Sequence, residues 1–145
     1  MQFHGEYQHR VDLQGRIAIP ARYREAFTDG IYLTRGFDQC IWVFSPEEWD
    51  SYSSRYAAMP HNSPSARTLR RKVFGWTFDL ELDRQGRVVL PQPLRQFAGL
   101  QEEVVIVGAG TWLELWDRAR WDEQVAEINA ADLDFVDDAG RVISD

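Results

Sequence analysis

Two stretches of the chain alternate hydrophobic and polar residues, one at the N-terminus and one near the middle. The first stretch places every second residue on one face, at Phe3, Gly5, Tyr7, His9 and Val11. The second does the same with Trp76, Phe78, Leu80 and Leu82. Alternation with a period of two is typical of a strand that buries one face. The pattern therefore predicts an equivalent strand in each half of the chain.

The same motif follows each predicted strand. Val11-Asp12-Leu13-Gln14-Gly15-Arg16-Ile17-Ala18-Ile19-Pro20 matches Leu82-Asp83-Arg84-Gln85-Gly86-Arg87-Val88-Val89-Leu90-Pro91, and the match extends to Arg24 and Arg95. After a slip of one residue, Ile41, Val43, Phe44 and Trp49 align with Leu113, Leu115, Trp116 and Trp121. Self-similarity of this kind indicates a tandem duplication.

Each copy predicts the same small α+β unit. Gly15 and Gly86 suit a tight turn, after which residues 17–19 and 88–90 are expected to return as the partner strands. Short helices are expected at about 20–28 and 91–98, followed by strands at about 31–35 and 40–44, and at 104–107 and 112–116. Ser45, Ser63 and Asp117 are helix-capping residues that predict three further helices, the last running to about 130. Beyond Ala131 the acid-rich sequence lacks a long apolar period, and we expect it to be frayed.

Composition places this sequence among globular domains of reducing compartments. The single cysteine, Cys40, excludes an intrachain disulfide. The sequence has neither a secretion signal nor an apolar run long enough for a membrane span. We therefore expect a cytoplasmic protein. The net charge is −7, but residues 122–145 alone hold 8 acidic residues against Arg141. Because the remaining body is neutral, the acidic total does not exclude nucleic acid as a partner.

The sequence contains no clear catalytic or metal-binding motif. The three histidines, His4, His9 and His61, match no zinc spacing, and Cys40 has no histidine near it in sequence. Gly108-Ala109-Gly110 is better interpreted as a hairpin turn than as a phosphate loop. We therefore expect no enzyme activity, no metal and no cofactor.

The arginines of the duplicated turns carry two compatible interpretations. In the first, Asp12 and Asp83 cap their turns and pair with Arg16 and Arg87. In the second, the hairpin presents basic side chains to a DNA backbone or groove, as β-ribbons do. The residues predicted to bind DNA are Arg10, Arg16, Arg22 and Arg24, and those predicted to shape the turns are Asp12, Gly15, Asp83, Gly86 and Arg87.

The two motifs resemble the bacterial MraZ family. Further similarities are Phe3-x-Gly5-Glu6-Tyr7, Ala66-Arg67 to Gly75, Ala98-Gly99-Leu100, Val107-Gly108 and Glu114-Leu115-Trp116-Asp117. The resemblance implies two AbrB/SpoVT-like units at 5–51 and 76–119 that exchange hairpins within one chain, forming an intramolecular pseudo-dimer. The intervening residues 52–75 would be a helical linker, and 120–145 a C-terminal helix and acidic tail. The family more often has Lys before the turn glycine, where this chain has Gln14 and Gln85.

The resemblance also implies a function. MraZ-like proteins are nucleoid-associated, ring-forming regulators that bind repeated DNA boxes and usually repress their own division and cell-wall operon. The family's turn arginine maps onto Arg16 and Arg87. The alternatives are an antitoxin-like interaction module, in which residues 131–145 would wrap a partner, and a hydrolase.

Two further expectations come from the residues themselves. The acidic residues Asp79, Glu81 and Asp83 before the second turn favour unequal roles, in which the first turn recognises DNA and Asp83 holds Arg87. The surplus of tryptophans, Trp42, Trp49, Trp112, Trp116 and Trp121, suggests subunit interfaces.

Overall fold

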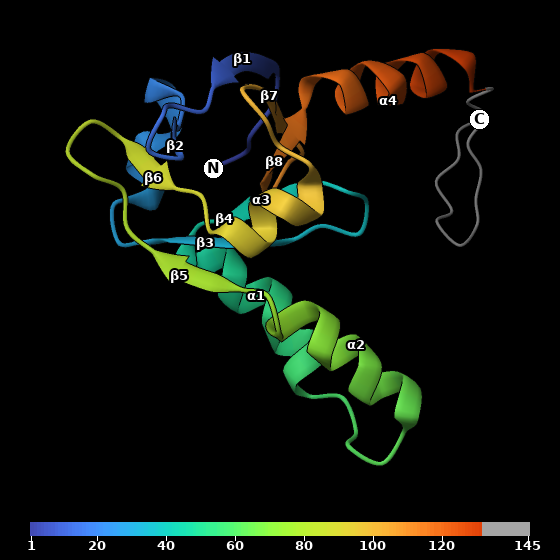
Figure 1. Ribbon diagram of the computed structural model, residues 1–145. Coiled ribbons are helices and arrows are strands. Elements are labelled where there is room, and N and C mark those ends of the chain that lie inside the picture. The colour runs from blue at the N-terminus through green and yellow to red at the C-terminus, as the bar shows by residue number, and fades with distance from the viewer. Residues whose placement is uncertain (132–145) are drawn as a thin grey trace.

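The computed structural model describes residues 1–131 and has a mixed α+β architecture (Figure 1). Its strands are β1 Glu6–Arg10, β2 Arg16–Ala18, β3 Ile31–Arg35, β4 Ile41–Phe44, β5 Phe78–Leu80, β6 Arg87–Val89, β7 Glu103–Gly108 and β8 Leu113–Asp117. Its helices are the 3₁₀ helix η1 Ala21–Phe27, α1 Pro46–Ala57, α2 Pro64–Phe74, α3 Gln92–Ala98 and α4 Arg118–Ala130. The segment 132–145, for which the sequence predicts a frayed tail, lies outside the described residues.

The two copies exchange strands in a six-stranded antiparallel sheet. The strand order is β1-β7-β8-β4-β3-β5, so the first strand of each copy pairs with the third strand of the other. Tyr7 lies opposite Ile106, and Tyr32 lies opposite Asp79. The exchange of hairpins implied by the family resemblance is therefore present within one chain.

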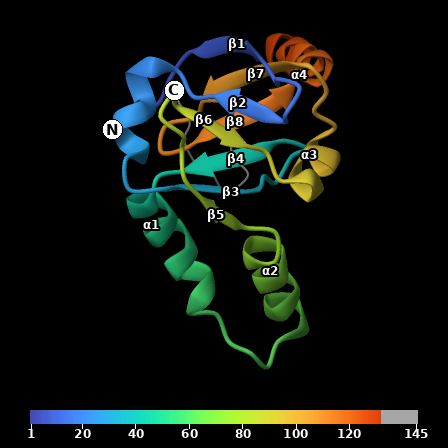
Figure 2. The same ribbon diagram turned by 60° about the vertical axis from the view of Figure 1, so that its left-hand side comes forward.

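The strands that follow the two turns pair with each other. β2 and β6 form a separate two-stranded antiparallel ribbon, with Ile17 opposite Val88 (Figure 2). The expectation that residues 17–19 and 88–90 fold back on the strand before them is wrong. Each turn closes only one pair of residues, Asp12 with Arg16 and Asp83 with Arg87, before its strands separate. β1 pairs with β7 and β5 pairs with β3 in the sheet, whereas β2 and β6 pair with each other.

One hydrophobic core is built jointly by the two copies. It lies between the ribbon and the facing side of the sheet, where Ile17 and Val88 meet Leu33, Leu113 and their neighbours. Phe27 of η1 and Leu94 of α3, which occupy corresponding helices in the two copies, are 1% and 0% exposed. Neither copy can close this core alone, so the ribbon, the sheet and both helices are expected to fold as one cooperative unit.

An aromatic cluster fills the other face of the sheet. Trp42, Trp49 and Trp116 are 7%, 7% and 4% exposed, and they pack with Tyr52 of α1 and Val73 of α2. Trp112 and Trp121 are partly buried against the same cluster. The sequence-based interpretation of these tryptophans as interface residues is thus wrong for the three buried ones, because the two-sided sheet needs them inside the monomer.

The helix ends follow the predicted chemistry. The Ser45 and Ser63 hydroxyls accept hydrogen bonds from the backbone N–H groups of Glu48 and Ala66, both at 3.2 Å. An Asp117 carboxylate oxygen accepts from the backbone N–H of Arg120 at 3.2 Å. These caps satisfy backbone donors that a helix start leaves free.

Candidate nucleic-acid interface

Each duplicated turn is held closed by its own aspartate. In the first turn, Asp12 Oδ1 accepts from the backbone N–H groups of Gln14 and Arg16, both at 2.9 Å. Asp12 Oδ2 accepts from Arg16 Nε at 2.8 Å, which fixes the guanidinium. Gly15 has a φ of 79°, a left-handed conformation that favours glycine.

The second turn repeats this geometry. Asp83 Oδ1 accepts from the N–H groups of Gln85 and Arg87 at 2.8 and 3.0 Å, and Asp83 Oδ2 accepts from Arg87 Nε at 2.9 Å. Gly86 has a φ of 76°. The sequence-based interpretation of Asp12 and Asp83 as turn caps paired with the arginines therefore describes the structure.

The ribbon brings the two turn arginines onto one surface. Arg16 lies opposite Val89 and Arg87 lies opposite Ala18, and residues that face each other across a ladder share a side of it. Ile17 and Val88 point the other way and are 1% and 2% exposed. Arg16, Ala18, Arg87 and Val89 thus form one outward surface, which we call the ribbon face. It consists of two arginines separated by small apolar side chains.

A second pair of arginines stands behind the turns, and it crosses between the copies. Arg24 of the first copy lies against Gly86 of the second turn, where a Cβ atom would collide with its guanidinium. Arg95 of the second copy lies against Gly15 of the first turn, with Nη1 3.4 Å from the position of a Cβ. Arg24 is therefore beside the second turn and not the first. Arg95 was not among the residues predicted from the sequence, although its alignment with Arg24 in the repeat was a signal for it.

The other two predicted arginines lie outside the ribbon face. Arg10, at the end of β1, faces Glu102 and Glu103 at 3.4 and 3.7 Å, so its charge is offset. Arg22 of η1 is exposed, and its guanidinium lies 5.2 Å from the centre of the Tyr23 ring. The structure thus brings Arg16, Arg87, Arg24 and Arg95 together and leaves Arg10 and Arg22 apart from them.

The two turns hold their arginines with the same geometry, and the unequal roles expected from the flanking acidic residues stay a prediction. Asp12 holds Arg16 in the same way that Asp83 holds Arg87, and the two arginine side chains are 27% and 30% exposed. Each turn also has one arginine of the other copy behind it. The two turns are therefore equivalent in geometry.

The other candidate groups are placed for packing. Cys40 is fully buried, and burial raises the pKa of its thiol, so it is protonated at neutral pH. Burial lowers the pKa of His9, which is half-buried on β1. Within residues 1–131 there is no group of three or more His, Cys, Asp or Glu side chains that could hold a metal ion. No helix in this range is long and apolar enough to cross a membrane.

Comparison with known proteins agrees with the duplicated architecture. The family model described as "MraZ protein, putative antitoxin-like" matches the chain twice, at residues 2–72 and 73–143. This chain belongs to the MraZ family. The two matches begin 71 residues apart, which is also the separation of Asp12 and Asp83 in the internal repeat.

Relatives of the family align over most of their length. The chain is 41% identical over 128 residues to the protein from Roseiflexus castenholzii, covering 88% of this chain and 90% of the relative. It is 45% identical over 119 residues to the protein from Herpetosiphon aurantiacus, covering 82% and 83%. The protein from Acetivibrio thermocellus is 38% identical over 127 residues, covering 88% and 89%. All three are named transcriptional regulator MraZ, a name that describes no enzyme.

Acid is expected to loosen the two turns of this MraZ chain. Hydrogen bonds from the Arg16 and Arg87 backbones hold the pKa of Asp12 and Asp83 below the usual value, and both arginine side chains add to this. A carboxylate whose pKa falls on folding stabilises the fold above its unfolded pKa and loses that contribution as pH falls toward its folded pKa. The melting temperature should therefore decline below about pH 4.

The matched variant is the double substitution Asp12→Asn/Asp83→Asn, which removes both titrating groups. Its melting temperature should lie below that of the parent at pH 7, and the difference should shrink between about pH 4 and pH 2. A difference that stays constant over this range would show that the two carboxylates contribute nothing through their charge.

Proposed function

We propose that this chain is a sequence-specific DNA-binding transcriptional regulator that represses its own division and cell-wall operon from the nucleoid. The observation that carries the proposal is the ribbon face, on which Arg16 and Arg87 are held by aspartates and separated by Ala18 and Val89. A two-stranded ribbon fits the major groove of DNA, and arginine is the side chain that most often reads guanine there. The names of the relatives support regulation of transcription.

The ribbon face suits this task because its arginines are ordered before DNA arrives. Each carboxylate engages the Nε atom of its arginine, and among residues 1–131 Nη1 of Arg16 and both terminal nitrogens of Arg87 have no hydrogen-bond acceptor. Fewer rotamers are therefore lost on binding, which lowers the entropic cost of recognition. Gln14 and Gln85, in place of the more common lysines, leave recognition to the arginines.

The direct experiment is a binding titration with DNA from upstream of the chain's own gene. We expect that duplex to bind more tightly than a scrambled duplex of equal length at the same salt concentration. Equal affinity for the two duplexes would contradict sequence-specific recognition.

Repeated boxes imply repeated binding surfaces, and we propose that the chain assembles into a ring-shaped homo-oligomer. Several ribbons on one ring would engage several boxes at once, which raises the overall affinity without new contacts. Sedimentation velocity should give a species several times heavier than the 16.9 kDa chain. A 16.9 kDa species throughout the micromolar range would contradict assembly.

The family description gives a reason to keep the antitoxin-like alternative. In that function the chain would bind a protein partner through the acidic segment 131–145. Deletion of residues 132–145 separates the two functions, because DNA binding through the ribbon face does not need them. We expect the truncated chain to keep its preference for the upstream duplex.

A further inference from the structure

The helical hairpin formed by α1 and α2 carries a block of positive charge that the ribbon face does not use. Residues 51–78 contain five basic residues and no Asp or Glu, whereas the rest of the chain has 11 basic and 23 acidic residues. The five are Arg55, Arg67, Arg70, Arg71 and Lys72. So strong a local excess in an acidic protein requires an explanation.

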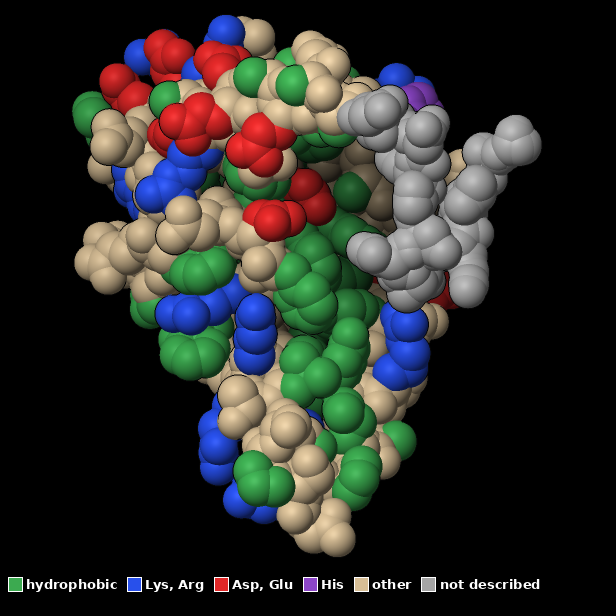
Figure 3. Space-filling model, turned by 90° about the vertical axis from the view of Figure 1, so that its right-hand side faces the viewer, with side chains coloured by type: hydrophobic (Ala, Val, Ile, Leu, Met, Phe, Trp, Pro, Cys, Tyr) green, Lys and Arg blue, Asp and Glu red, His purple; other side chains and the backbone are tan. Residues whose placement is uncertain are grey.

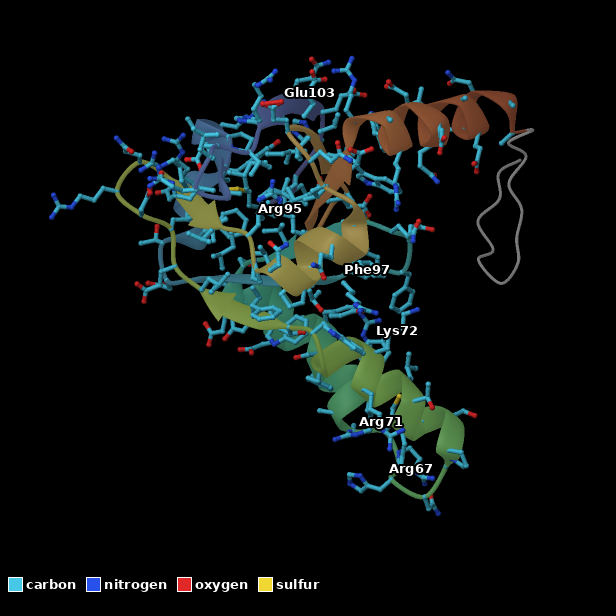
Figure 4. All side chains as sticks on the ribbon, viewed as in Figure 1. Arg67, Arg71, Lys72, Arg95, Phe97 and Glu103 are labelled. Atoms are coloured by element: carbon cyan, nitrogen blue, oxygen red, sulfur yellow. The ribbon has the colours of Figure 1, made fainter. Side chains whose placement is uncertain are left out.

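The hairpin projects from the sheet and away from the ribbon (Figures 1 and 2). On the side shown in Figure 3, its projecting end displays Lys and Arg side chains and no carboxylates. Figure 4 shows Arg67, Arg71 and Lys72 following one another along α2 toward the sheet. The charge is therefore gathered on an arm of the molecule that reaches outward.

One of the five basic residues has a structural role. Nη1 of Arg70 donates to the backbone carbonyls of Tyr56 and Ala57 at 2.9 and 2.8 Å, so that Arg70 ties α2 to the end of α1. The other four, Arg55, Arg67, Arg71 and Lys72, are exposed, and we call them the hairpin basic face. Arg67 also donates to the carbonyl of His61 at 3.0 Å, near the tip.

The hairpin basic face forms no ion pair within residues 1–131, and Lys72 Nζ lies 4.8 Å from the centre of the Phe37 ring. All ion pairs in this range join arginines elsewhere to their carboxylates, at Arg10, Arg16, Arg87 and Arg118. Arg67 and Arg71 are four residues apart on α2, where like charges repel and destabilise a helix. A helix that needs only solubility intersperses charges of both signs. The arrangement thus lowers the stability of α2 and favours binding of an anionic partner.

The shape of the hairpin decides between the two large anionic surfaces, bilayers and nucleic acids. A membrane-binding helix needs an exposed apolar side to insert. Here Trp49, Tyr52 and Val73 are buried between the helices and the sheet. Phe74, at 37%, is the one large hydrophobic side chain of α1 and α2 that is exposed, which is too little for an inserting side. Binding to the phosphate backbone needs only outward guanidinium and ammonium groups, which the hairpin supplies.

We propose that the hairpin basic face binds the phosphate backbone of DNA independently of sequence, outside the segment held by the ribbon face. The proposal rests on the proposed function, since it assigns a second contact to the same DNA partner. In this proposal the ribbon distinguishes DNA sequences, and the helical hairpin adds affinity for any duplex.

The test is the salt dependence of binding to the upstream duplex and to a scrambled duplex. Each lost phosphate contact should lower the slope of log K against log salt by about 0.9. We expect a decrease of about 0.9 for Arg71→Gln and about twice that for Arg67→Gln/Arg71→Gln, equally on both duplexes. Arg118→Gln is the matched control, because it removes the same charge from α4, where Arg118 faces Asp122, and it should leave the slope unchanged.

Three outcomes overturn the proposal, and they are distinguishable. A wild-type slope in the double variant, with wild-type binding intact, overturns the hairpin contact alone. If the slope falls and sedimentation shows that the variant no longer assembles, the hairpin basic face belongs to an interface between copies. Absence of binding to either duplex by the wild-type protein overturns the proposed function itself.

Discussion

Replacing either Arg16 or Arg87 with alanine is expected to weaken binding to the upstream duplex by about 5- to 150-fold. This range corresponds to the roughly 1–3 kcal/mol carried by a base contact. The two losses should be similar, because the turns hold their arginines with the same set of hydrogen bonds and present them on one ribbon face. Affinity for a scrambled duplex should change much less.

The matched control for this pair is Arg10→Ala. Arg10 is also an exposed arginine, but Glu102 and Glu103 offset its charge, so we expect little change in affinity or specificity. Sedimentation of each variant separates a lost contact from lost assembly. A loss confined to Arg16→Ala would contradict the equivalence of the turns and would favour the first turn alone, as the charges of the flanking sequence suggest.

Substituting Gly108 with alanine is expected to destabilise the fold by about 3 kcal/mol and to lower the melting temperature by about 10 °C. A Cβ atom at this position would lie closer than 3.0 Å to the backbone of Phe3 and His4. The N-terminal segment would have to move away from β7, which would uncover Phe3, now 2% exposed in the joint core. Thermal unfolding followed by circular dichroism measures the loss.

Gly110→Ala is the control for backbone strain, because Gly110 lies in the turn between β7 and β8. Gly110 has a φ of 91°, but a Cβ there meets no atom within 4 Å. Its cost should therefore be only the conformational one, about 1–2 kcal/mol for a side chain in the left-handed region. If Gly108→Ala is no more destabilising than Gly110→Ala, the N-terminal segment does not depend on the close approach to β7.

Local sequence signals predicted the elements well. The alternation through Tyr7 and Phe78 marks real strands, and Ser45, Ser63 and Asp117 begin helices as expected. These features depend on residues close in sequence, such as a hydroxyl and a backbone N–H three residues on. The strand pairing could not be derived in this way. A strand after a tight turn has the same pattern whether it pairs with its own hairpin or with the other copy, and only the family resemblance indicated the exchange.

The candidate site was predicted in part, for the same reason. Asp12 and Arg16 lie within one turn, so their pairing follows from the motif. The positions of Arg24 beside Gly86 and Arg95 beside Gly15 depend on the exchange between copies, which proximity in sequence cannot show. Trp42 and Trp116 were misassigned because composition does not reveal that the sheet buries both of its faces.

The central claim is that the ribbon face touches DNA, and site-directed crosslinking measures this contact most directly. Val89 lies on the ribbon face and is 56% exposed. Ile128 is 50% exposed and lies near the end of α4, which projects away from β2 and β6 (Figure 1). The only native cysteine, Cys40, is fully buried, so Val89→Cys and Ile128→Cys can each carry a single photoreactive probe. With the upstream duplex, the probe at position 89 should crosslink to DNA and the probe at position 128 should not. Efficient crosslinking from position 128 with none from position 89 would contradict the account.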